Sequence, residues 1–382
     1  MTLILKSDKT ATVSMGNVNG ISGPQDWAMF FDFENELYAT KKAGLLKQDY
    51  KLADVVEATR PNLNGAPISI SKDGTEKTVA STTEIRTALL KNGRFGLLAE
   101  DINQNFFLNS SAPATQTVLM LAAATKIVAS CEGTGSLTIT GDIVNSPITV
   151  TSDTPSIMTR LSSSTACNLN ITVNGSLNHA QIELTTGAQT ATSKVKTTAT
   201  SAYRERELVK VKSSLFNSII TNKSALTVLI QTMDYNPVVN QAGASFCQRL
   251  TLVSGSSLKI MRESGIDSNL KLTSRSYQYV GSTPSNPSQT LNGTWTSQGR
   301  FIARNQACTL DAGVLRSAFN GVAENTLVIN NPFSVDEIGF GYGYSSPIGV
   351  NGLRGIVTKL VVYDRVLSQA AITELTNSWQ YA

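Results

Sequence analysis

Short stretches in which apolar and polar residues alternate recur along this chain. In SLTIT (136–140), ITVT (148–151) and LNITV (169–173), every second residue is apolar. Turn-forming residues such as GTG (133–135) separate the stretches. Because successive side chains of a strand point to opposite faces, the pattern is typical of short strands that bury one face. Strands of this length at this spacing predict β-sandwiches.

The composition agrees with a mostly β fold. Only 16% of the 382 residues are Asp, Glu, Lys or Arg, whereas about a quarter is usual in soluble proteins. Thr, Ser, Asn and Gly take their place, and these residues favour strands and turns over helix interiors. A chain of this length is also too long for one ordinary core, so two or three domains are expected.

Two changes of pattern divide the chain into three predicted parts. Residues 1–105 form a charged N-terminal region of mixed character, in which ISIS before KDG predicts a hairpin. Residues 106–204 form a β-sandwich module, and residues 205–382 form a second sandwich. YRERE (203–207), which mixes both signs of charge, marks the second boundary.

The end of the chain predicts one short helix. Leu367, Ala371, Ile372 and Leu375 recur at helical spacing, and Ser368 is placed to cap the first turn. A helix this short does not stand alone, so we expect it to cover the open edge or end of a sheet.

Charge and hydropathy exclude two classes of partner. The net charge is +4, with 32 basic and 28 acidic residues and no dense Lys/Arg block, so no nucleic-acid partner is expected. MTLILKSDKT has too short an apolar run for a secretion signal. No stretch approaches the roughly 18 apolar residues of a membrane span, so no membrane insertion is expected.

The cysteines predict neither a metal site nor a disulfide framework. Structural zinc needs closely spaced soft ligands, whereas the four cysteines are far apart and the chain has one histidine, His179. We expect buried free thiols at Cys131, Cys167, Cys247 and Cys308.

GIVTKLVVYDRVLSQAAITELTNSW (355–379) resembles the closing strand and helix of laminin-G/concanavalin A-like jelly rolls. In this resemblance the strand carries Ile356, Leu360, Val362 and Tyr363. NPFSVDEIGFGYGY (331–344) resembles the strand before it. The resemblance covers about the last 175 residues. It implies a mostly β chain with two β-sandwich domains of jelly-roll type after the mixed N-terminal region.

HAQIELTTGAQTATSKVKTTATSAYRERE (179–207) is similar to the end of β-sandwich modules in phage and prophage structural proteins. Those read A-Q-x-E-x-G, then T-S-x-x-x-T, then an Arg; here the Gly comes two positions late, at Gly187, and Arg204 stands where the Arg lies. Upstream, DFENELYA, EATRPN, SKDGTEKTVA and GLLAEDINQNFFLNSS follow the leader often seen before such modules. The approximate matches there are Gly96, Leu97, Leu98, Glu100 and Asn105, with the family's Asn one residue earlier.

These resemblances imply a tailed-phage virion protein, such as a fibre, tail-tip or capsid-surface component, assembled in the host cytoplasm. Residues 1–105 would then attach it to the particle. Other virion proteins and a host cell-surface glycan are the expected partners. A homo-oligomer, most simply a trimer, is expected because closed symmetry is the default for oligomers.

No residues are predicted to be catalytic. Asp32 and Glu34 alternate along FDFENE, which suits a glycosidase pair, but an acidic solvent face is the preferred interpretation. His179 begins a strand and is interpreted as a satisfied surface or edge histidine. No cofactor is expected. The jelly-roll family often carries Ca²⁺, which stays open as an alternative, but no D-x-D-x-D ligand run is present.

Aromatic residues near loops are the predicted glycan-binding residues, because aromatic faces stack on the C–H faces of sugars. They are Trp295, Tyr277, Tyr279, Tyr342 and Tyr344. Phe340 shares a strand face with the last two, and the alternative is that this face belongs to the sandwich core.

Three functions remain open. The first is a fibre or receptor-binding type appendage with a carbohydrate-binding-like sandwich. The second is a capsid decoration or head-fibre protein with a chiefly structural role. A bacterial lectin-like module or depolymerase is disfavoured by the missing signal peptide and the missing acid/base cluster.

Overall fold

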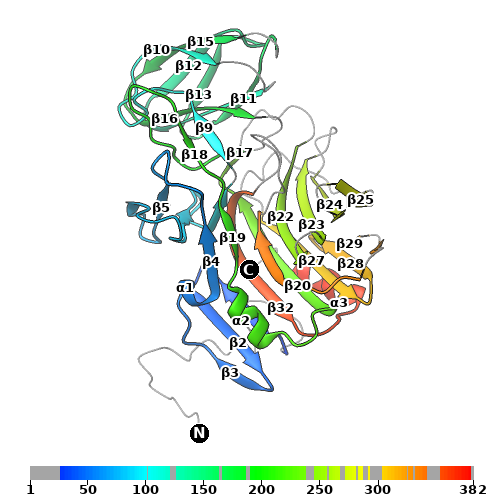
Figure 1. Cartoon of the computed structure of the whole chain (residues 1–382). Coiled ribbons are helices and arrows are strands. Elements are labelled where there is room, and N and C mark those ends of the chain that lie inside the picture. The colour runs from blue at the N-terminus through cyan, green and yellow to red at the C-terminus, as the bar shows by residue number, and fades with distance from the viewer. Residues whose placement is uncertain are drawn as a thin grey trace.

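The protein is mostly β and consists of two β-sandwiches (Figure 1). The computed structural model describes residues 26–100, 102–120, 126–162, 166–185, 190–237, 245–255, 258–266, 272–280, 283–286, 291–292, 303–324, 326–329, 332–341 and 353–379. The smaller sandwich is inserted into the larger one along the chain and lies at the top of Figure 1. No helix in these ranges is long and apolar enough to cross a membrane.

The inserted sandwich is built from two antiparallel sheets and spans residues 103–204. One sheet has the order β10 (Gln116–Met120), β15 (Cys167–Asn174), β12 (Ser136–Gly141), β13 (Ile148–Thr151). The other has the order β14 (Ser156–Thr159), β11 (Lys126–Gly133), β16 (Leu177–Thr185), β9 (Asn103–Asn105), β18 (Ala202–Arg204). In β15 Cys167, Leu169 and Ile171 are buried and the polar residues between them are exposed, as the alternating sequence predicted, while Val173 is half-buried.

One sheet of the larger sandwich has eleven strands. Its main order is β29 (Val322–Ala323), β28 (Val314–Phe319), β27 (Arg304–Asp311), β20 (Ala225–Asp234), β32 (Arg354–Tyr363), β1 (Met29–Asp32), β2 (Leu37–Lys42), β3 (Leu45–Lys47). β30 (Leu327–Val328) pairs with β28, β8 (Phe95–Glu100) pairs with β32, and β7 (Thr87–Leu89) pairs with β8. The predicted closing strand, β32, is therefore central, and all ten of its residues are buried.

The facing sheet has eight strands within the described residues. Its order is β25 (Thr283–Asn286), β24 (Leu272–Val280), β23 (Leu258–Ile266), β22 (Ser245–Ser254), β31 (Glu337–Phe340), β19 (Leu208–Val211), β4 (Val56–Thr59), and β26 (Leu291–Asn292) pairs with β24. The remaining elements are the hairpin β5 (Ile68–Ile70) and β6 (Glu76–Thr78), the short pair β17 (Thr190–Ala191) and β21 (Asn236–Pro237), and the helices α1 (Leu52–Val55), α2 (Ser213–Ile219) and α3 (Gln369–Ser378).

The N-terminal region differs from the sequence prediction. Residues 1–105 were expected to form a region of their own, but β1 pairs with β32, β8 pairs with β32, and β4 pairs with β19. Strands from both sides of the inserted sandwich thus complete the same two sheets. Gly96 allows β8 to lie close to β32, because a Cβ at this position would collide with the backbone carbonyl of Val357 on that neighbouring strand.

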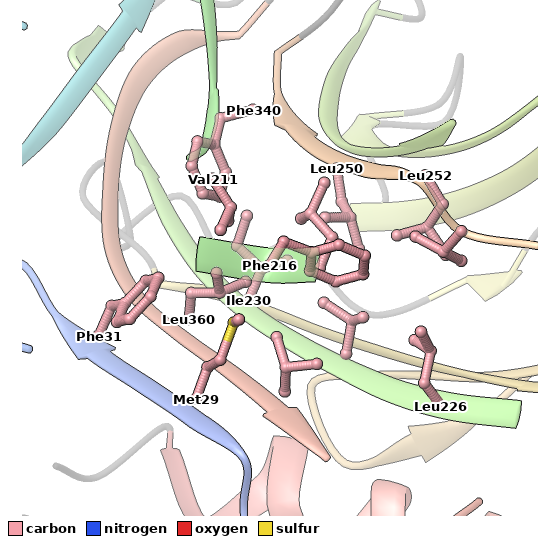
Figure 2. Close-up of a cluster of buried hydrophobic side chains, with 14 of the residues drawn as sticks. Met29, Phe31, Val211, Phe216, Leu226, Ile230, Leu250, Leu252, Phe340 and Leu360 are labelled. Carbon is pink, nitrogen blue, oxygen red and sulfur yellow. The ribbon is translucent and has the colours of Figure 1, made fainter. Parts of the chain in front are cut away.

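The core of the larger sandwich lies between its two sheets (Figure 2). Met29, Ile230 and Leu360 come from the eleven-stranded sheet, and Leu250 comes from the facing one. Phe216 of α2 packs among them, as Figure 2 shows. A single apolar core thus joins chain segments from residue 28 to residue 362.

The closing helix covers a face of the eleven-stranded sheet and not its edge or end. Ser368 accepts a hydrogen bond from the Ala371 amide at 3.2 Å, which confirms the predicted cap. Ile372 and Leu375 are buried in a second apolar cluster with Phe30 and Val361, outside the main core. Since the other face of these strands lines the main core, β1 and β32 are buried on both sides.

This packing predicts the stability of two variants of the full chain. Leu375→Asp would place a charge among apolar side chains, and we expect a loss of several kcal/mol, because an unpaired buried carboxylate is costly. Glu374→Ala changes the exposed neighbour and should cost under about 0.5 kcal/mol. Thermal melts measure both, and equal melting temperatures would contradict the buried stripe.

Candidate functional site

A buried network of charged side chains joins the two sandwiches. Arg86 is fully buried, and its guanidinium donates to Glu207 Oε1 at 2.5 Å, to Glu207 Oε2 at 2.7 Å and to Glu100 Oε2 at 2.7 Å. Glu207 also accepts from Arg60 Nε at 2.6 Å. The chain enters the inserted sandwich just after Glu100 and has left it by Glu207, so one guanidinium fastens both ends of the insertion.

The network keeps its carboxylates ionised. Burial alone would raise the pKa of Glu100, but Arg204 and Arg86 beside it outweigh burial and hold this pKa at about 2. Burial likewise opposes ionisation of Glu207, and Arg86 and Arg60 lower its pKa below the usual value. Burial and pairing of this kind make the network structural.

Buried residues of the stretch 179–207 adjoin this network. Gln181 Nε2 donates to Glu183 Oε1 at 2.8 Å, and the Thr192 amide donates to Glu183 Oε2 at 3.0 Å. The Ser193 amide donates to Glu100 Oε1 at 2.7 Å. Burial raises the pKa of Glu183, which has no hydrogen bond from an arginine among the bonds that the described residues make. Each of these side chains is buried.

Side chains of the leader stretch 96–111 contact the segment that contains Thr192 and Ser193. Asn105 Nδ2 donates to the carbonyl of Val195 at 2.9 Å, and Ser110 Oγ accepts from the Thr197 amide at 2.9 Å. The chain between residues 190 and 197 is therefore held against the inserted sandwich by side chains from the leader and by side chains from β16.

A cleft of about 540 Å³ opens between the two sandwiches beside this segment. The hairpin β5–β6 and the turn from β7 to β8 form one wall, and loops and strand ends of the inserted sandwich form the other. The lining residues are Ile70, Gly74, Glu76, Leu89, Leu90, Lys91, Gly93, Glu132, Gly133, Ser152, Asn178, Lys194 and Tyr235.

Ion pairs cross the cleft. Lys194 Nζ lies 2.7 Å from Glu132 Oε2 of the inserted sandwich and also binds Glu76 of the hairpin. Burial opposes the charge of Lys194, but these hydrogen bonds outweigh it and raise the lysine pKa. Lys91 Nζ donates to Ser152 Oγ at 2.9 Å, a second link between the walls.

His179 lies beside the cleft and is buried, with 4% of its surface exposed. The interpretation as a surface or edge histidine is therefore wrong, because β16 runs through the interior of its sheet. The ring Nε2 lies 3.4 Å from Gln181 Oε1. Burial lowers the histidine pKa below its ordinary value. A smaller pocket next to the cleft is lined by His179, Glu132, Lys194 and Tyr235, among others.

The side chains of the predicted glycan-binding residues all fall outside what the structure describes. Trp295, Tyr342 and Tyr344 lie outside the described residues, and Tyr277 and Tyr279 belong to β24, where their side chains are not described. Phe340, on the strand that leads to Tyr342, is buried in the core, with its ring centroid 6.1 Å from that of Phe33. At Phe340 the strand face is thus sandwich core.

Asp32 and Glu34 do not form an acidic solvent face. Asp32 is buried, and its carboxylate accepts from the backbone amide of Asn35 at 3.0 Å and from Asn35 Nδ2 at 2.9 Å. Glu34 forms an ion pair with Arg94. The first carboxylate closes a turn after β1, and the second ties that turn to the loop before β8.

Three cysteines, Cys131, Cys167 and Cys308, are buried free thiols, as predicted. Burial raises the pKa of Cys131 to about 11 and that of Cys308 to about 12. The side chain of Cys247 is not described. Within the described ranges, no three His, Cys, Asp or Glu side chains gather in a way that could hold a metal ion.

The motifs identified in the sequence contain most of the network residues. The sequence analysis did not predict that these residues contact one another, and it did not predict the cleft. The only available signal was the presence of Arg and Glu within motifs of a chain that has few charges. The cleft left no signal, because its walls come from segments up to 165 positions apart, from Ile70 to Tyr235.

No protein-family model matches the chain, and no curated protein matches it. Solved structures do match parts of it. The CBM40 domain of a Ruminococcus gnavus IT-sialidase, bound to α2,6 sialyllactose, is 15% identical over 41% of this chain and 84% of its own, with a TM-score of 0.29.

A heptameric SAP-like pentraxin from Limulus polyphemus is 13% identical over 40% of this chain and 70% of its own, with a TM-score of 0.31. Domain 4 of the arabinanase AbnA from Geobacillus stearothermophilus, in complex with arabinotriose, is 15% identical over 45% of this chain and 73% of its own, with a TM-score of 0.28. Likeness at this level carries no argument about function.

The network predicts a large difference between two arginine variants. Arg86→Ala would leave Glu100 and Glu207 buried without their main partner, and breaking a buried ion pair costs about 3–5 kcal/mol. Arg316→Ala breaks a partly exposed pair with Asp311 and should cost at most about 1 kcal/mol. Urea unfolding measures both, and similar losses would show that the network does not support the fold.

The buried histidine predicts a pH effect. Because its pKa is lower in the folded chain, the unfolded chain binds a proton first as the pH falls below about 6.5. The stability that the buried neutral ring of His179 contributes is therefore present above about pH 6.5. It is lost as the pH falls through the pKa that His179 has in the folded chain. We expect the melting temperature of the native protein, relative to His179→Gln, to fall between pH 7.5 and pH 5. A constant difference would contradict the burial of a neutral ring.

Proposed function

We propose that the chain is an exposed structural protein of a tailed-phage particle, of the fibre or receptor-binding type, that binds a host carbohydrate through its β-sandwiches. One observation carries the proposal: the two stretches that resemble phage structural proteins, 96–111 and 179–207, pack against each other. Asn105 binds the carbonyl of Val195, Ser110 binds Thr197, and Glu100 binds Ser193.

This contact makes the two resemblances parts of one structural feature. Residues 190–197 are fixed to the inserted sandwich, and the Arg86 network fixes both ends of that sandwich to the larger one. A protein that extends from a particle needs such a junction, because a loosely tethered domain would not hold a binding surface at a defined distance and angle. In this proposal the chain forms a trimer and binds other virion proteins. It has no enzymatic activity.

The second candidate is a capsid decoration or head-fibre protein with a chiefly structural role. The same junction favours it, because a rigid connection between sandwiches serves an architectural protein whether or not a ligand binds.

Labelling and binding experiments test the two parts separately. An antiserum against the purified protein, detected with gold on whole particles of a phage that encodes this chain, should label the particle surface. Label on the tail supports the receptor-binding type, label on the head supports decoration, and unlabelled particles would refute the virion role. Binding of the full chain to an oligosaccharide array tests the carbohydrate part.

A further inference from the structure

We infer that the cleft between the two sandwiches is a binding site for a neutral saccharide. The inference rests on the carbohydrate-binding part of the proposed function and gives it a location. The sequence analysis instead placed the glycan at aromatic residues such as Trp295, which lies outside the described residues.

The size and walls of the cleft suit a small ligand. Its volume of about 540 Å³ lies within the range of about 300–1,000 Å³ that is usual for such sites. Sites of this kind occur preferentially at domain interfaces, and here the hairpin β5–β6 faces the inserted sandwich across the opening.

The charges of the cleft favour an uncharged ligand. Among the described residues that line it, two lysines and two glutamates carry a charge, and these formal charges sum to zero. Lys194 is already shared between Glu132 and Glu76, and Lys91 binds Ser152 and lies 3.9 Å from Asp153. An anionic ligand would have to displace a carboxylate from a lysine, whereas a neutral one leaves every pair intact.

The remaining lining groups suit the two faces of a sugar ring. Ile70, Leu89 and Tyr235 are partly exposed as residues and line the cleft, so they offer surface to C–H groups. Asn178 is exposed at the inserted sandwich, and an amide both donates to and accepts from hydroxyl groups. Apolar surface beside a few polar groups is the usual composition of a small-molecule site.

The cleft is also held open in advance. Residues 190–197 are fixed from behind by Glu100 and Asn105, and Lys194 projects from this segment to bridge both walls. A ligand therefore meets walls that are already positioned, and less of its binding free energy is spent on ordering them.

The experiment uses the full chain on an array of neutral, sialylated and sulfated oligosaccharides, followed by calorimetric titration of the strongest binder. Asn178→Ala removes the exposed amide and should raise the Kd about fivefold, the effect of about one hydrogen bond. Tyr235→Ala should raise it more, whereas Tyr235→Phe keeps the ring and should retain most of the affinity. Asn168→Ala is the matched control, because Asn168 is an exposed asparagine of the same sandwich, on β15 and outside the cleft.

Binding of neutral saccharides that weakens in the cleft variants, but not in Asn168→Ala or Trp295→Ala, supports the inference. Binding that Trp295→Ala abolishes and Asn178→Ala leaves unchanged overturns the cleft and keeps the proposed carbohydrate function. Binding of anionic glycans alone overturns the neutral ligand. If no oligosaccharide binds, the carbohydrate function and the cleft both fail, while gold labelling still decides the virion role. Should Tyr235→Ala not fold, the exposed Asn178→Ala decides alone.

Discussion

One buried guanidinium joins the two ends of the inserted sandwich. Arg86 binds Glu100, where the chain leaves the larger sandwich, and Glu207, where it returns. The Glu207 amide also donates to the Glu100 carbonyl at 3.0 Å, so the two ends of the insertion lie side by side. An insertion of about a hundred residues can then fold as a sandwich of its own without separating strands that must pair in one sheet.

A network of this kind is costly to bury and is stable only when its members are paired. Only 16% of the residues in this chain are charged, and several of these charged residues lie in the network. Glu183 accepts no hydrogen bond from an arginine among the described residues, and burial raises its pKa. Its hydrogen-bond partners are the neutral groups of Gln181, Thr192 and Asn103.

The same segment that closes the network also builds the cleft. Ser193 binds Glu100 inside the network, and the next residue, Lys194, reaches the opposite way to Glu132 and Glu76. Two consecutive residues of this segment therefore supply a contact of the network and a lining residue of the cleft. The proposed virion role uses the rigidity of this junction, and the proposed saccharide site uses the space beside it.

The local elements follow from the order of the amino acids alone. Alternation specified the strands of the inserted sandwich, and Ser368 with the apolar stripe at Ile372 and Leu375 specified the closing helix, because burial period and capping are local properties. The surfaces against which these elements pack became known from the folded structure. Phe30 pairs with Val361 across more than three hundred residues, and a four-residue strand carries no information about so distant a partner. Such long-range pairings bury Asp32, bring the motif residues into contact and form the cleft. Local patterns in the sequence therefore did not predict these features.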